Sequence, residues 1–195
     1  IFQKLYKRGL DITEGDEKRK YFKDPEEGVA THIALAFIAY YKKFGFEDGL
    51  FKKFWKQNIN RQAEFVSSIG RIFISGENAQ LNDFVRREPE SKKRIMETWE
   101  WLLKNYSSPI LFTKFGFWVN IEKQIFDPAW LAKQLKKTLE KTNGILEWDY
   151  ALAKSINILA EAAPQETLEI IRLYLLEGSV NGDKIRMPFT YDEEW

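Results

Sequence analysis

The sequence predicts an all-α fold in which antiparallel helical hairpins stack as an α-α superhelix of the HEAT type. Three observations lead to this prediction. Capping residues, prolines and glycines stand where helices would begin and end, as at Asp127-Pro128 and Asn143-Gly144. Apolar residues between these boundaries recur at spacings of three and four. Helices of the second half recur about every 20 residues, so a helical hairpin would recur about every 40 residues, as in helical repeats. An irregular helical bundle is the alternative.

The chain is expected to form one helical-array domain over residues 24–178, flanked by two shorter segments. Residues 1–23 are charge-dense and weakly periodic, with Lys18-Arg19-Lys20 after Asp16-Glu17, and are interpreted as a lead-in segment or linker. Residues 179–195 form a tail in which Asn181-Gly182 is a good tight-turn dipeptide. The tail is therefore a candidate short hairpin.

The first helix is expected to begin at Asp24-Pro25, where a cap and a proline precede two acids, and to run to about Lys43. A shorter helix follows, from about Glu47 to Gln57. The next covers Arg61 to Ser75, because its apolar residues keep helical spacing. A strand over Ile72–Ile74 is the less favoured alternative.

A helix from about Glu90 to Tyr106 comes next, begun by Pro89 and broken by Ser107-Ser108-Pro109. The aromatic segment Phe112–Val119 is too short and too interrupted by glycine to assign. The sequence leaves open whether it forms a turn of helix or an extended plug in the core.

The last three helices are expected over Asp127–Asn143, Glu147–Ala163 and from Pro164 to a stop at Gly178. Each carries an apolar face at helical spacing. The faces comprise Trp130, Leu131, Leu135 and Leu139; then Trp148, Leu152, Ile156, Leu159, Ala160 and Ala163; then Leu168, Ile171 and Leu175.

The stretches Phe115-Gly116-Phe117-Trp118 and Asp127-Pro128-Ala129-Trp130-Leu131, with the alanine-rich helix ending at Ala163-Pro164, resemble C-terminal helical regions of large multidomain bacterial proteins. These include ATPases and defence-type effectors. The resemblance covers roughly the last 80 residues. It implies a scaffold or sensor segment whose effector domain lies elsewhere, and it carries over no functional residue.

Composition excludes several classes of protein. With no cysteine the chain has no disulfide, thiolate metal site or thiol nucleophile. Its net charge of +1 gives no global attraction to nucleic acid or anionic lipid. No apolar run approaches the roughly 20 residues that span a bilayer, so no membrane partner is expected. A cytoplasmic setting is the simplest fit. The chain begins at Ile1, and we expect it to be part of a larger protein.

The sequence predicts no catalytic, cofactor-binding or metal-binding residues. His32 is the single histidine and has no recognisable companions for metal ligation or base catalysis, so a structural role is favoured. Paired acids such as Glu26-Glu27 and Glu47-Asp48 stand where helix N-termini attract carboxylates. Helix capping therefore explains these acidic pairs better than a metal-binding or acid–base role does.

Basic and aromatic residues alternate between Tyr40 and Gln62, as on surfaces where lysines contact phosphates and rings stack on bases. On a helix over 47–57, however, the rings share one face and the lysines the other, as in an ordinary amphipathic helix. The candidate nucleic-acid contacts are Lys42, Lys43, Lys52, Lys53, Lys56 and Arg61.

The favoured function is a non-enzymatic helical-repeat module that presents a surface to a protein partner or to another domain of its own chain. The alternative is a helical nucleic-acid-binding module that uses a basic ridge around residues 42–61. The third and least favoured hypothesis is an enzyme with an unfamiliar carboxylate or tyrosine site. It ranks last because no set of nucleophile, base and orienting group can be assembled from the sequence.

Overall fold

Every regular element that the computed structural model describes is helical. It describes residues 25–40, 42, 44–75, 79–120 and 125–177. The all-α prediction is therefore confirmed for these residues. Packing contacts group the chain into two compact units, Ile1–Thr98 and Trp99–Trp195, and the division falls within a helix. The prediction of one domain over 24–178 stays a prediction.

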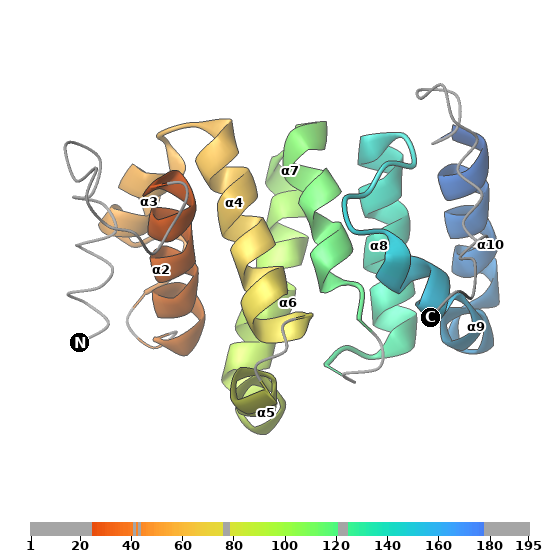
Figure 1. Cartoon of the computed structure of the whole chain (residues 1–195), viewed down its shortest axis with the longest axis horizontal. Helices are drawn as coiled ribbons and strands as arrows, with labels where there is room; N and C mark the ends of the chain where they lie inside the picture. Colours follow the sequence, from red (N-terminus) through yellow and green to blue (C-terminus); the bar gives the residue numbers. More distant parts are fainter. Residues whose placement is uncertain (1–24, 41, 43, 76–78, 121–124, 178–195) are drawn as a thin grey trace, which may run out of the picture. The chain divides into compact units, whose positions relative to one another are not determined.

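The first unit is built around two packed helices (Figure 1). Its elements are α2 (Pro25–Ala39), α3 (Gly49–Trp55), α4 (Ile59–Ile69), the π-helical turn η1 (Gly70–Ile74), α5 (Ala79–Arg87) and the start of α6 (Pro89–Asn105). Helix α2 packs along α4, and α5 packs against η1. The chain over Ile72–Ile74 continues α4 as a π-helical turn, so the strand alternative is wrong. Helix α5 is not predicted from the sequence.

The core of the first unit is a cluster of aromatic rings. The ring of Phe37 on α2 lies 4.7 Å from that of Phe51 and 5.5 Å from that of Phe65, and all three are buried. The guanidinium of Arg94 on α6 stands 5.1 Å from the centre of the Phe37 ring. Such edge, tilted and cation contacts add to the hydrophobic gain from burying the rings.

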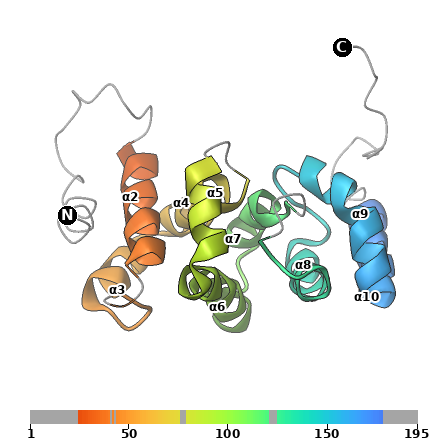
Figure 2. The same ribbon diagram turned by 90° about the horizontal axis from the view of Figure 1, so that it is seen from below.

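The second unit is built around helix α8 (Pro128–Thr142), which packs against three other helices. Its other elements after α6 are α7 (Pro109–Thr113), the 3₁₀-helical turn η2 (Lys114–Trp118), α9 (Tyr150–Ala162), α10 (Pro164–Arg172) and the π-helical turn η4 (Leu173–Glu177). Helix α8 packs against α7, α9 and α10, and α9 packs against α10 (Figure 2).

The core of the second unit surrounds Trp99, near the end of α6. Its indole stacks on the ring of Phe115 at 4.5 Å and meets Trp118 edge-on at 5.4 Å. Phe112, Phe115 and Trp118 are all fully buried. The aromatic segment that the sequence left open is therefore helical, and three of its rings, those of Phe112, Phe115 and Trp118, lie in the core.

Several predicted boundaries are confirmed by the geometry of the backbone. Asp127 caps α8, accepting a hydrogen bond from the Trp130 N–H at 2.9 Å, and Asn143 ends the helix in the left-handed region at φ 52°. Pro164 opens α10 as expected. The lead-in segment, the tail with Asn181-Gly182, the stop at Gly178 and the side chains of Glu26 and Glu27 lie outside the described residues.

Candidate functional site

The basic face of α3 is set by a local cap. The Asp48 carboxylate accepts hydrogen bonds from the backbone N–H groups of Leu50 at 2.8 Å and Phe51 at 3.2 Å. The helix that follows buries its apolar face and exposes its lysines, confirming the predicted separation. Buried are Phe51, Phe54 and Trp55, and exposed are Lys52, Lys53 and Lys56. Rings enclosed in the core are not available to stack on bases.

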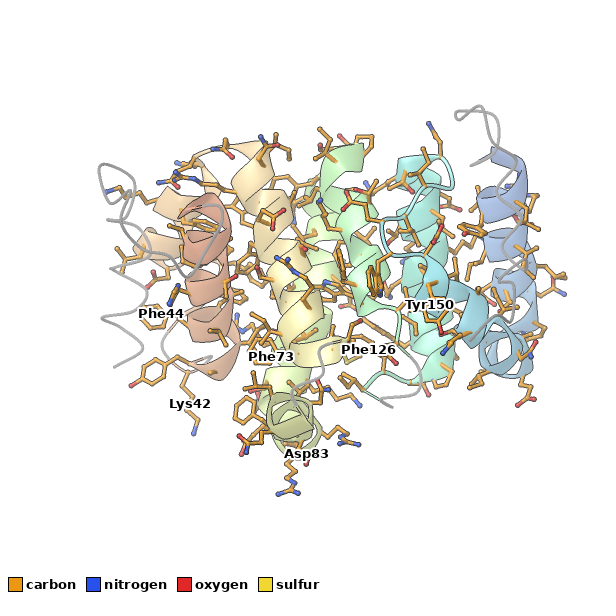
Figure 3. All side chains as sticks on the ribbon, in the orientation of Figure 1. Lys42, Phe44, Phe73, Asp83, Phe126 and Tyr150 are labelled. Atoms are coloured by element: carbon orange, nitrogen blue, oxygen red, sulfur yellow. The ribbon has the colours of Figure 1, made fainter. Side chains whose placement is uncertain are left out.

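Five of the six predicted contact residues are described, and they come from three places in the first unit. Lys52 and Lys53 lie on α3 and Lys56 directly follows it; Lys52 is ion-paired with Glu47. Arg61 lies on α4, and its guanidinium donates a hydrogen bond to the side-chain oxygen of Gln57. Lys42 follows α2 and projects away from the ribbon (Figure 3). Lys43 lies outside the described residues.

A second candidate surface lies in the loop before α9, where the predicted helix start at Glu147 is wrong. The Glu147 backbone N–H donates to the Thr113 carbonyl at 2.9 Å. Its carboxylate accepts from the Thr113 hydroxyl at 3.2 Å and pairs with the Lys114 ammonium at 2.7 Å. These bonds tie Glu147 to α7 and η2, so α9 begins only at Tyr150.

Gly116 makes this tie physically feasible. A Cβ added at Gly116 would stand 1.6 Å from the Glu147 carbonyl oxygen. Only glycine lets the two backbones approach this closely. Gly116 is therefore the residue at which η2 contacts the loop before α9. The same glycine makes the aromatic segment hard to assign from the sequence.

Trp148 lies outside the helix face on which the sequence places it. Its backbone is left-handed, with φ 58°, and its side chain is 60% exposed. One face of the indole stacks on Phe117 with centroids 5.7 Å apart. Tyr150 is 40% exposed, and the Lys154 ammonium lies 4.6 Å from its ring centre. Leu168, also assigned to an apolar face, is exposed on α10.

One signal in the sequence could have placed Trp148 correctly. Asp149 follows it directly, and aspartate is among the residues preferred immediately before a helix. Asp149 does occupy that position, but its carboxylate accepts a hydrogen bond from the Tyr174 hydroxyl at 2.6 Å. The hydrogen bonds between Glu147 and Thr113 could not be predicted from a local sequence pattern, because the two residues are distant in sequence.

The described residues hold no candidate metal site. Among the described residues there is no cluster of three or more His, Asp or Glu side chains able to hold a metal ion. His32 Nδ1 lies 2.7 Å from the Gly28 carbonyl oxygen of the same helix, in keeping with a structural role. No helix of the described ranges is long and apolar enough to cross a membrane.

Comparison of the chain with protein-family models, curated proteins and solved structures finds no match. The resemblance to helical regions of multidomain bacterial proteins therefore stays a prediction.

Proposed function

We propose that this chain is a non-enzymatic interaction module that binds a protein partner or another domain of its own chain. The observation that supports it most is the distribution of exposed large apolar side chains. Within the described residues all of them belong to the second unit: Ile110, Trp148, Tyr150, Ile158 and Leu168. Their concentration in one unit suits a surface that is covered on binding.

The proposal includes the HEAT-like arrangement and a cytoplasmic setting. Consecutive packing of α8, α9 and α10 is what helical repeats require, because each helix pair buries its apolar face against its neighbours. Absence of cysteine suits a reducing compartment. An array of this kind acts as a scaffold that presents a surface to its partner.

A helical nucleic-acid-binding module is the second candidate, supported by the three exposed lysines on and directly after α3. Burial of the neighbouring rings leaves phosphate contact as the means of binding, without base stacking. Such binding would weaken steeply as salt concentration rises.

The deciding experiment immobilises the purified chain and captures partners from lysate of its source cells, with and without nuclease. We expect a nuclease-resistant protein that is lost when Ile158 and Leu168 are changed to Ser. Because both side chains are exposed, these changes should alter the free energy of unfolding by less than about 1 kcal/mol. The matched control changes the exposed polar residues Glu161 and Gln165 to Ser.

The same capture tests the second candidate. Changing Lys52, Lys53 and Lys56 to Glu should leave protein capture intact, as should the control pair Lys133→Glu and Lys137→Glu on α8. Nucleic acid dominating the eluate, and lost only with the α3 changes, would instead establish the nucleic-acid module and overturn the protein-interaction proposal.

A further inference from the structure

Trp148 combines a costly backbone with an exposed side chain. A left-handed φ of 58° is unfavourable for a bulky L-residue, and glycine or asparagine would adopt it more readily. A tryptophan in this conformation would ordinarily gain stability by burial, yet its side chain is 60% exposed. Strained residues whose side chains are not buried are candidates for a role in recognition.

The loop holds the Trp148 ring as a fixed platform. Phe117 backs one indole face at 5.7 Å with an interplanar angle of 18°, which is a stacked arrangement. On one side Glu147 is anchored by its backbone and carboxylate to Thr113 and Lys114. On the other side, the Asp149 carboxylate accepts a hydrogen bond from the Tyr174 hydroxyl. A ring positioned before binding loses little conformational entropy when a partner arrives.

The Trp148 indole N–H is an available donor. Within the part of the chain that the structure describes, the Trp148 side chain makes only the stack on Phe117. An exposed aromatic ring that also offers an N–H group suits a ligand with an apolar surface and a hydrogen-bond acceptor.

Two acidic side chains, Glu147 and Asp149, and two basic ones, Lys114 and Lys154, lie in and beside the loop. The Glu147 carboxylate pairs with Lys114 at 2.7 Å, the Asp149 carboxylate accepts from Tyr174, and the Lys154 ammonium lies over the Tyr150 ring. This surface therefore has no surplus of cations, which binding a polyanion would require. It complements an uncharged segment better than a nucleic acid.

We propose that Trp148, backed by Phe117 and followed by Tyr150, binds a proline-rich segment of a protein partner in the polyproline II conformation. Such a segment presents proline rings to aromatic side chains, and its backbone carbonyls have no internal hydrogen-bond donors. The indole N–H supplies a donor for one of those carbonyls. This inference rests on the proposed protein-interaction function and names the chemistry of the partner.

The test titrates the whole chain with an oligoproline peptide and follows the indole N–H resonance of Trp148 by NMR, assigned with Trp148→Phe. We expect a saturable shift, absent with a glycine-serine peptide of equal length. Trp148→Ala should weaken binding by at least about tenfold, as expected for a central aromatic anchor. Trp148→Phe keeps a ring but loses the donor, and should weaken it by about fivefold, the worth of one hydrogen bond. Trp101→Phe, on α6, is the matched control and should leave affinity unchanged.

Three results would overturn the inference: no binding of oligoproline, unchanged affinity in Trp148→Ala, or a Trp148 response to oligothymidine in place of oligoproline. If oligoproline does not bind while Trp148→Ala still captures protein from lysate, this inference fails and the interaction function stands. If neither oligoproline nor any protein from lysate binds, this inference fails together with the proposal of a separate protein partner.

Discussion

At the scale of single residues, Thr138 shows how one hydroxyl can organise a core. It lies on α8, is fully buried, and accepts a hydrogen bond from the Trp99 indole N–H at 2.9 Å. The same hydroxyl donates to the Gln134 carbonyl at 2.9 Å. Trp99 could be assigned to the core from its helical spacing. Its partner could not, because a threonine on a helix carries no sign of which distant donor it meets.

We predict that Thr138→Val destabilises the protein by about 1–3 kcal/mol, because it leaves the buried Trp99 N–H without an acceptor. Thr138→Ser is the matched control. It keeps the hydroxyl and removes one methyl group, so it should cost about 1 kcal/mol. Chemical denaturation followed by circular dichroism gives both free energies of unfolding. A Thr138→Val variant as stable as the parent would show that the hydrogen bond contributes nothing.

At the scale of elements, a helix start could be predicted where it depends on adjacent residues and not where distant contacts decide it. Asp127-Pro128 marks the start of α8 because cap and proline act on the N–H groups next to them. Glu147 fails as the start of α9 because Thr113 and Lys114 hold it. Trp148 consequently moves from a predicted helix face to an exposed loop.

We predict that Gly116→Ala destabilises the protein by about 3 kcal/mol or more, since the new methyl group would overlap the Glu147 backbone. Gly49→Ala is the control, because a Cβ there meets nothing within 4 Å and the residue opens α3. It should be neutral, or stabilising by up to about 1 kcal/mol. Thermal unfolding of both variants makes the comparison. A Gly116→Ala variant as stable as the parent would contradict the close approach.

At the scale of the whole chain, composition and patterning were enough to predict the fold class. Its length, with 44% hydrophobic residues and many aromatic ones, is enough to build a hydrophobic core. They did not indicate the division into two compact units after Thr98. The rings around Phe37 lie in the first unit, and Trp99 stacks on Phe115 in the second.

We predict that Thr138→Val lowers hydrogen-exchange protection of backbone amides in α8 more than in α4. The bonds of Thr138 to Trp99 and Gln134 lie within the second unit, and local stability follows local packing. Mass spectrometry of exchange in the two helices provides the measurement. An equal loss of protection in α4 and α8 would mean that the chain opens as a single cooperative unit.

The sequence by itself determined that this protein is helical and where most helices begin and end, because capping, proline and apolar spacing act over a few neighbouring residues. It also determined the two faces of α3, where buried rings and exposed lysines follow from helical spacing alone. Only the tertiary structure decided how Glu147 is held and why Gly116 must be glycine. The Trp148 surface depends on these contacts between segments distant in sequence, and no local pattern encodes them.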